Sequence, residues 1–333
     1  MSLQGDLQHL ARDTTLHAYS FDGDILDMLD SFGVAAGPLD GRVLAYAQTL
    51  DSTIKSVPAA WDYLLNTLGQ ASLNLQFAGA STLDSRITFS RASTVATRVN
   101  SAGLIETLTT NQPRFDYDPV TLAPRGLLIE EARTNNEKNG IADTVSNGTA
   151  STDGTLGPDG VAASKFTADS VTTAHFVYKT SYTPAITTAY AVSVYLKAGT
   201  SSVLQVTTSG NFNSGFAALN VDLIAGTFAL VGTGGSGGFL TSVGGGWYRA
   251  GFVVTTTAAA VGAAIMVCLA NNLADNRLPN VVTNGTQTFY HACRQFESVG
   301  ATGATTFPTS YIPTTTAAVT RAADVASMTG TNF

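Results

Sequence analysis

The stretch AYAVSVYLKA at residues 189–198 decides the fold class of this chain. Its apolar residues Val192, Val194 and Leu196 are separated by single residues, so in an extended chain they share one face. The residues between them, Tyr195 included, are predicted to face outward. An alternation of this kind predicts a β-strand that contributes one face to a buried core.

Further runs with strand composition lie downstream: SVLQVTT (202–208), FAALNVDL (216–223), TFALV (227–231), GWYRAGFVVTT (246–256), AAIMVCLA (263–270) and QTFYHACRQFE (287–297). Turn-forming Gly, Asn and Pro residues separate these runs. Their spacing predicts a mainly β chain with a β-sandwich or jelly roll over residues 139–316. The Gly-rich piece GTGGSGGFLTSVGGG (232–246) is predicted to be a surface loop, and residues 139–160 a loop or linker.

Residues 73–138 precede the sandwich and are predicted to be an extended β connector. Alternation in SLNLQF (72–77) and RITFS (86–90) indicates short strands, and Gly and Pro interrupt the pieces that follow. A compact turn is expected at residues 116–119. Residues 317–333 are expected to form a C-terminal tail or the start of a further domain.

Residues 1–72 differ in pattern and are predicted to be a helical attachment or oligomerisation segment. Apolar residues there recur with a 3.5-residue period, which is the spacing of a coiled-coil seam. Pro58 interrupts the run and is expected to begin a second helix. The run fits either an oligomerising stalk or two amphipathic helices that pack on a neighbouring domain. The residues proposed to mediate oligomerisation or attachment are Val43, Leu50, Ile54, Val57, Trp61, Leu64 and Leu68.

Charge is scarce and unevenly placed. Charged residues make up 12% of the chain, against about 25% in ordinary soluble domains. Of the net charge of −7, residues 1–72 carry −6, from nine Asp and three basic residues. With no basic face to neutralise phosphates, nucleic-acid binding is not expected. The chain has neither a signal-peptide pattern nor an apolar stretch long enough to span a bilayer, so no membrane insertion is expected.

The sequence contains no motif for a catalytic nucleophile, a metalloprotease or a phosphate-binding loop, so the chain is expected not to be an enzyme. A glycosidase would need two converging carboxylates. Asp116 and Asp118 sit in a Pro-bounded turn, where Asp usually caps backbone amides. Glu130 and Glu131 would point to opposite faces of a strand. Nearby arginines are expected to bind these acids and pin the connector to the sandwich: Arg114, Arg125 and Arg133.

Sugar binding needs an aromatic side chain that stacks on the sugar ring, together with polar groups that hold its hydroxyls. Trp247 directly follows a Gly-rich piece and is expected to anchor the core or its rim instead. The residues proposed as glycan ligands, each of which also suits ordinary packing, are Phe176, Tyr178, Tyr182, Tyr195 and Phe212.

Two further features concern ions and thiols. Asp153, Asp159 and Asp169 lie in loops and could supply oxygen ligands to a structural Ca²⁺, although their spacing matches no EF-hand; no other cofactor is expected. Cys268 and Cys293 are the only cysteines, and both fall within predicted strands. They are expected to be buried thiols, with a disulfide as the alternative if their strands are neighbours.

Several phrases in the chain resemble a recurring family of tailed-bacteriophage virion proteins. They are ITFSRAST (87–94), RFDYDPVT (114–121), RGLLIEEARTN (125–135), SVYLKAGT (193–200), GWYR (246–249) and PTSYIPTTTAAVTRAADVASM (308–328). The resemblance covers about residues 73–330 and implies a jelly roll similar to carbohydrate-binding modules. The strand FYHACRQFE (289–297) departs from the aromatic-rich strand that the family usually has there.

The resemblance implies a structural component of a phage particle, such as a tail fibre, a spike or a decoration protein. Such a protein is made in the host cytoplasm and ends in the virion. The partners it implies are other virion proteins, further copies of the chain (a trimer by analogy) and host surface polysaccharide. Two alternatives stay open: a tailspike-type enzyme that degrades polysaccharide, and an adaptor that binds only protein.

Overall fold

The computed structural model describes residues 77, 79–179, 183–185, 187–209, 215–256, 264–299 and 307–328. These residues belong to one compact unit that spans Phe77–Met328. They form β-strands and contain no helix, and their strands pair antiparallel, which confirms the mainly β prediction. The helical segment predicted for residues 1–72, with its heptad residues, lies outside the described residues.

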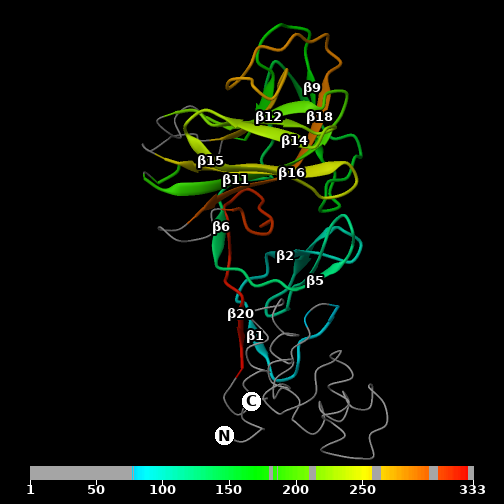
Figure 1. Ribbon diagram of the computed structural model, residues 1–333, viewed down its shortest axis with the longest axis vertical. Helices are drawn as coiled ribbons and strands as arrows, with labels where there is room; N and C mark the ends of the chain where they lie inside the picture. Colours follow the sequence, from blue (N-terminus) through cyan, green and yellow to red (C-terminus); the bar gives the residue numbers. More distant parts are fainter. Residues whose placement is uncertain are drawn as a thin grey trace, which may run out of the picture. The chain divides into compact units, whose positions relative to one another are not determined.

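Two larger sheets form the two layers that Figure 1 shows, and we call the pair the sandwich. The six-stranded sheet contains, in spatial order, β14 (Thr227–Val231), β13 (Ala218–Asp222), β12 (Val203–Thr208), β17 (Ile265–Leu269), β10 (Phe176–Tyr178) and β7 (Thr144–Ser146). The eight-stranded sheet contains β15 (Gly235–Ser242), β16 (Trp247–Thr255), β11 (Ala189–Ala198), β18 (Thr288–Ser298), β6 (Arg133–Asn135) and β19 (Val319–Arg321), with β9 (Ser164–Ala168) beside β18 and β8 (Gly148–Ser151) beside β9.

Both sheets send alternate apolar side chains into one shared core. Val206 and Leu219 come from the six-stranded sheet, and Val192, Phe252 and Phe296 come from the eight-stranded sheet. Each of these residues is 2% exposed or less. The removal of this apolar surface from water is the main term that favours the sandwich. The alternation that predicted the strand at residues 189–198 therefore also predicted which of its faces joins this core.

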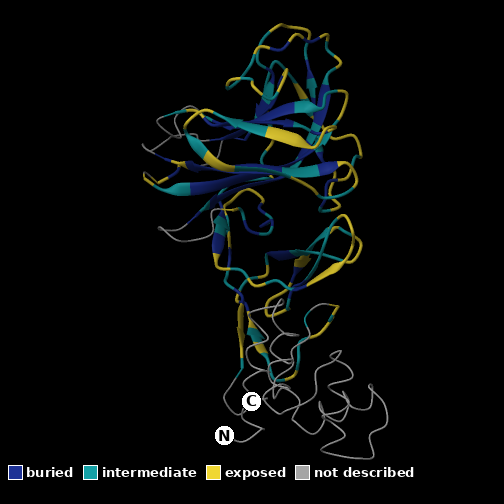
Figure 2. Ribbon diagram, in the orientation of Figure 1, coloured by how far each residue is buried: buried dark blue, intermediate teal, exposed yellow. Residues whose placement is uncertain are grey.

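The opposite face of β11 is buried as well, so the predicted outward exposure of Ser193 and Tyr195 is wrong. Ser193 is 0% exposed and Tyr195 is 6% exposed, and Figure 2 shows burial along much of both larger sheets. The reason is that the chain around Thr309 lies on this face. Gln295 and Arg249 both donate to the carbonyl oxygen of Thr309, at 3.1 and 2.8 Å.

The Gly-rich piece 232–246 contains a strand, β15, where a surface loop was predicted. Its glycines serve close packing. A Cβ added at Gly235 would lie 2.7 Å from the Cβ of Ala217, and one added at Gly238 would lie 3.0 Å from the Cδ1 of Leu219. Glycine therefore lets β15 lie against the other sheet at a distance that larger residues would prevent.

Residues 139–160 also contain two strands, β7 and β8, where a loop or linker was predicted. The two strands belong to different sheets and are joined by the single residue Asn147. Asn147 has a φ of 55°, a conformation that Asn tolerates better than most residues. At the start of β8, a Cβ on Gly148 would lie 2.4 Å from the carbonyl oxygen of Thr167. The small and polar residues of this segment thus make a corner between the sheets.

Three small ladders complete the unit. β1 and β20 lie side by side in Figure 1, so the first and last strands of the described unit are paired. Strand β6, which lies in the predicted connector, belongs to the eight-stranded sheet, and so does β19, which lies in the predicted tail. The small ladders are β1 (Thr88–Ser90) with β20 (Val325–Ser327), β2 (Ala96–Val99) with β3 (Ile105–Leu108), and β4 (Phe115–Tyr117) with β5 (Pro124–Leu127).

Cys268 and Cys293 are both free and buried, which confirms the prediction of buried thiols. They lie on β17 and β18, in different sheets, so their strands are not paired. Burial raises the pKa of Cys268 to about 12, and burial also raises the pKa of Cys293 well above its ordinary value.

We expect neither thiol to react with a thiol reagent such as iodoacetamide while the chain is folded, because only an accessible thiolate is nucleophilic. Mass spectrometry after an hour of labelling should find no adduct on the native chain and two adducts after urea denaturation. Rapid labelling of the native chain, or a denatured chain that needs reduction first, would contradict this expectation.

A bulge in β18 changes the direction of its side chains. The register with β11 shifts there, so Cys293 and Arg294 together face the single residue Val194, and Cys293 has a φ of 48°. Bulges of this kind re-aim the side chains beside them. Arg294, which is 1% exposed, consequently points between the two sheets. Its Nη1 donates to the carbonyl oxygen of Ile265 in the opposite sheet at 2.7 Å.

Glu137 is the acidic side chain nearest to Arg294 in this interior. It is 2% exposed, and its Oε1 lies 4.0 Å from the Nη1 of Arg294. Burial raises the pKa of Glu137 to about 7, although Arg294 and Lys179 oppose the change. The unfolded chain titrates near the ordinary value of 4.5. Between these two values the folded chain keeps a proton that the unfolded chain loses, so the free energy of unfolding falls as the pH rises.

Glu137→Gln should remove this part of the pH dependence, because a neutral amide does not titrate. Urea unfolding at about pH 5 and pH 8 measures the pH dependence of stability. From pH 5 to pH 8 the free energy of unfolding should fall more for the wild-type chain than for the variant. Glu106→Gln, at a partly exposed carboxylate that pairs with Arg98, is the matched control and should leave the difference unchanged. Parallel pH profiles for the wild-type chain and Glu137→Gln would show the expectation to be wrong.

Candidate functional site

The proposed glycan ligands are only partly brought together. Phe176 and Tyr178 are neighbours on one face of β10, half-buried, with ring centroids 5.9 Å apart and rings tilted by 38°. Tyr195 lies on β11 in the other sheet and is buried. Tyr182 and Phe212 lie outside the described residues. The structure therefore places two of the five beside each other, on the six-stranded sheet.

Tyr195 borders a groove of about 430 Å³ beside the outer face of the eight-stranded sheet. The guanidinium of Arg249 lies 5.4 Å from the centre of the Tyr195 ring and covers it. Phe239 and Phe307 line the same groove, and Phe307 is 57% exposed. The exposed Phe307 and the stacked Tyr195 and Arg249 in one groove are a combination that suits contact with a sugar ring.

Trp247 is an anchor of the core, as predicted. It is 4% exposed and packs with Tyr195 and Tyr311 in a small apolar cluster on the outer side of the eight-stranded sheet. Its indole Nε1 donates to the carbonyl oxygen of Leu156 at 3.1 Å. The polar end of the ring is therefore satisfied, which is the usual condition for burying Trp.

The acids Asp116 and Asp118 have separate structural tasks. An Oδ1 of Asp116 accepts the N–H of Val99 at 2.7 Å, and burial raises the pKa of Asp116 despite this bond. Asp118 caps the N–H of Thr121 at 2.8 Å and binds Arg125 at 2.7 Å. The turn role predicted for this pair is confirmed for Asp118, which begins the turn; Asp116 lies within β4.

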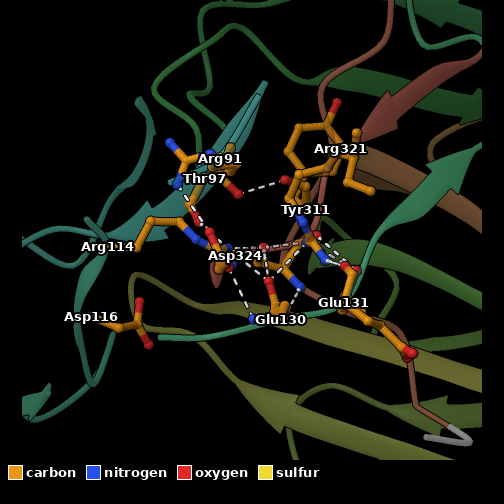
Figure 3. A network of polar contacts seen from close by, with 12 residues as sticks. Arg91, Thr97, Arg114, Asp116, Glu130, Glu131, Tyr311, Arg321 and Asp324 are labelled. Atoms are coloured by element: carbon orange, nitrogen blue, oxygen red, sulfur yellow. Dashed lines mark hydrogen bonds and ion pairs between the residues drawn. The ribbon is translucent and has the colours of Figure 1, made fainter. Parts of the chain in front are cut away.

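A polar cluster joins the N-terminal and C-terminal segments of the unit, and Figure 3 shows it. Asp324 pairs with Arg91 at 3.1 Å and also with Arg114. Glu130 pairs with Arg114 at 2.7 Å and with Arg321 at 2.8 Å. The side chains of all except Glu130 are 0% exposed, and that of Glu130 is 15% exposed. We call these five residues the clasp.

Backbone groups hold the two carboxylates of the clasp in place. The N–H of Glu130 donates to the Oδ2 of Asp324, and the N–H of Asp324 donates to the carbonyl oxygen of Glu130, both at 2.9 Å. Ser310 donates to the Glu130 carboxylate from its N–H at 2.7 Å and from its Oγ at 2.6 Å. Charge-assisted bonds of this kind are stronger than neutral ones.

The electrostatic balance of the clasp favours the ionised form of Glu130. Burial alone would raise the pKa of Glu130, but Arg321 and Arg114 outweigh it, and the pKa is lowered. The clasp holds three guanidinium groups and two carboxylates, of which only Glu130 is partly exposed. Removal of either carboxylate would leave buried positive charge without its partner.

Sequence reasoning found part of this cluster. The predicted pairing of Arg114 with the acids of the connector is confirmed, because Arg114 binds Glu130. The two other arginines bind outside the clasp: Arg125 pairs with Asp118, and Arg133 binds Glu131, with its Nε 3.0 Å from the Oε1. The prediction missed Arg91, Arg321 and Asp324, which the quoted phrases contain but which no local spacing connects.

The aspartates considered for a structural Ca²⁺ occupy separate loops. Asp153 accepts a hydrogen bond from the Tyr290 hydroxyl at 2.8 Å, while Asp159 and Asp169 each cap a backbone N–H two residues downstream. Among the residues that the structure describes, no group of three or more metal-ligating side chains is assembled. None of the described residues belongs to a helix that is long and apolar enough to cross a bilayer.

No protein-family model matches the chain, and no curated protein matches it.

Proposed function

We propose that the chain is a non-enzymatic structural component of a tailed-bacteriophage particle, either a fibre, a spike or a decoration protein. The sandwich is then a jelly roll of the carbohydrate-binding type. The observation that supports this proposal is the composition of the clasp. Its five residues come from four of the phrases that resemble phage virion proteins, namely ITFSRAST, RFDYDPVT, RGLLIEEARTN and PTSYIPTTTAAVTRAADVASM.

The clasp suits a protein that works outside the cell. Chain ends are the usual starting points of fraying and proteolysis unless they are tied down. Here Arg91, near the first strand of the unit, and Asp324, near the last, are bound to each other in the interior. Residues from the phrases that carry the resemblance therefore bind the two ends of the β unit to each other.

Detection of the chain on particles tests the proposal. Particles from a lysate of the host that carries the gene would be purified on a density gradient, analysed by mass spectrometry and labelled with a gold-conjugated antibody to the chain. We expect a fixed copy number per particle and labelling at one location. A chain that stays entirely in the soluble fraction of the lysate would contradict the proposal.

The proposed role includes contact between the sandwich and host surface polysaccharide. The purified chain should then bind intact host cells, and periodate oxidation of the cell-surface sugars should abolish that binding. Binding that survives oxidation would favour an adaptor that contacts protein.

Self-association is a further part of the proposal, with residues 39–69 as its source and other virion proteins as the alternative partners. We expect the full chain to be an oligomer, a trimer by analogy, and a chain that begins at Leu73 to be a monomer. Sedimentation velocity of the two chains measures their oligomeric states. If the full chain is itself a monomer, its N-terminal segment is not a stalk.

A further inference from the structure

A cavity of about 400 Å³ opens beside the bulge of β18. One edge of β18 pairs with β9 only from Thr288 to His291, and it pairs with β6 only at Glu297. Between these two points the side chain of Asn139 replaces a neighbouring strand. Its Nδ2 donates to the carbonyl oxygen of Arg294 at 2.8 Å, and its Oδ1 accepts the N–H of Arg294 at 3.0 Å. The break in the sheet gives access to polar groups between the two layers.

Asp143 is the central polar group of the cavity. Its Oδ2 accepts the hydroxyl of Ser164 at 2.5 Å and lies 3.5 Å from the Nε2 of His291. Its Oδ1 lies 3.2 Å from the Nζ of Lys179. The side chains of Asp143 and Lys179 are each 9% exposed, and that of His291 is 2% exposed. Four polar side chains from separate strands and loops therefore converge on one buried point.

The hydrogen bonds of His291 assign its tautomer. The Nε of Arg294 donates to the Nδ1 of His291 at 3.4 Å, so the ring proton is on Nε2. Burial and the charge of Arg294 lower the pKa of His291 well below its ordinary value, so the ring is neutral. The Nε2 is buried and has no hydrogen-bond partner within the described residues; the Oδ1 of Asp143 is buried too and makes no hydrogen bond there, but it is ion-paired with Lys179. The cavity thus holds one donor that lacks a hydrogen bond within the described residues, beside a carboxylate whose lone pairs can accept further hydrogen bonds.

The charges around the cavity select the class of ligand. The negative charges of Asp143 and Asp159 disfavour an anionic ligand, and the positive charges of Lys179 and Arg294 disfavour a cationic one. A hydroxyl group can donate and accept at once, so it can satisfy a donor and an acceptor that lie side by side. Tyr311 and other apolar lining residues supply a surface for C–H groups, and the volume is that of a small-molecule site. These features together fit a neutral, hydroxyl-rich ligand.

We propose that this cavity binds one neutral sugar residue of a polysaccharide, with Asp143, His291 and Lys179 holding its hydroxyl groups. This inference rests on the proposed contact between the sandwich and surface glycan. The cavity is preferred to the groove beside Tyr195 because Lys179 and His291 both lie within 3.5 Å of Asp143, whereas the two carboxylates of that groove belong to separate contacts. There Asp116 is bound to Val99, and Glu130 belongs to the clasp. The structure thereby assigns the sugar to a site that Phe176, Tyr178 and Tyr195 do not line.

The experiment uses the full chain and an array of oligosaccharides built from neutral hexoses and deoxyhexoses, with calorimetric titration of those that bind. Asp143→Asn should weaken binding at least tenfold. Ala142→Trp should do the same, because Ala142 is exposed at the cavity wall and an indole there would fill the entrance without removing an interior contact. The matched controls are Asp169→Asn and Ala225→Trp, which lie outside the cavity and should leave binding unchanged. Circular dichroism checks that each variant is folded.

The outcomes separate this inference from the proposed function. If Phe307→Ala in the groove abolishes binding while Asp143→Asn and Ala142→Trp do not, the cavity is not the site, although the glycan contact stands. If no oligosaccharide binds and the chain is nevertheless present on particles, the inference is wrong and the structural role stands. If binding depends on Asp143 and the chain is absent from particles, the inferred sugar site is supported and the proposed role in the virion is wrong.

Discussion

Asp324→Asn is expected to lower the free energy of unfolding by about 3–5 kcal/mol, the usual cost of removing one partner from a buried ion pair. The substitution conserves shape and removes only charge, so little of the loss would come from a cavity. Arg91 would be left without a carboxylate partner, and Arg114 would keep only Glu130. Because all three side chains of the Asp324 pairs are 0% exposed, water cannot replace the missing charge.

Urea unfolding of the full chain, followed by tryptophan fluorescence, measures this loss. The matched control is Arg125→Ala, which removes an ion pair to Asp118 in which the arginine side chain is 53% exposed. Exposed pairs contribute about 0–1 kcal/mol, so the control should change stability little. If Asp324→Asn were as stable as Arg125→Ala, the clasp would not hold the two ends of the unit together.

The bounds of the strands were predicted best for uninterrupted runs that end at a glycine. The run at residues 189–198 has the same bounds as β11, and TFALV (227–231) has the same bounds as β14. In the first, a period of two is visible in the sequence itself, because one face meets the core and successive residues must alternate; the second is an apolar run between Gly226 and Gly232. The alternation could not show that the second face of β11 is also covered, because the covering chain lies more than a hundred residues downstream.

Glycine explains the strand that was missed. In isolation a run such as GTGGSGG predicts a loop, since glycine has high conformational freedom and no side chain to pack. Strand β15 needs glycine at positions 235 and 238, because residues of the other sheet lie within about 3 Å of where a Cβ atom would be. That proximity belongs to the folded chain, and no local pattern in the sequence contains it.

Long-range pairing limited the prediction of the clasp and of the cavity in the same way. Arg114 and Glu130 are 16 residues apart, so their pairing could be proposed from the sequence. Arg114 and Asp324 are 210 residues apart, and nothing local connects them. In β18, strict alternation would place Cys293 on the same face as His291. The bulge places Arg294 there instead, so the cavity depends on one extra residue in a strand.

Phe296→Ala is expected to have the second large effect, a loss of about 3–5 kcal/mol in the free energy of unfolding, as is usual for truncation of a buried Phe. Phe296 is 2% exposed and stacks on Tyr190, with ring centroids 4.7 Å apart and an interplanar angle of 14°. Its ring lies in the core shared by the two larger sheets. The truncation therefore removes both apolar contact and an aromatic pair, and leaves a cavity between the layers.

The comparison with an exposed phenylalanine makes this prediction specific to the sandwich. Phe228, on β14, is 41% exposed, and Phe228→Ala should cost less than about 1 kcal/mol. The slope of stability against urea should stay the same in both variants, because neither changes how much surface unfolding exposes. If the two variants lost similar stability, Phe296 would not lie between two packed sheets. If Phe296→Ala alone lost several kcal/mol, the packing of the sheets would be what keeps the unit folded.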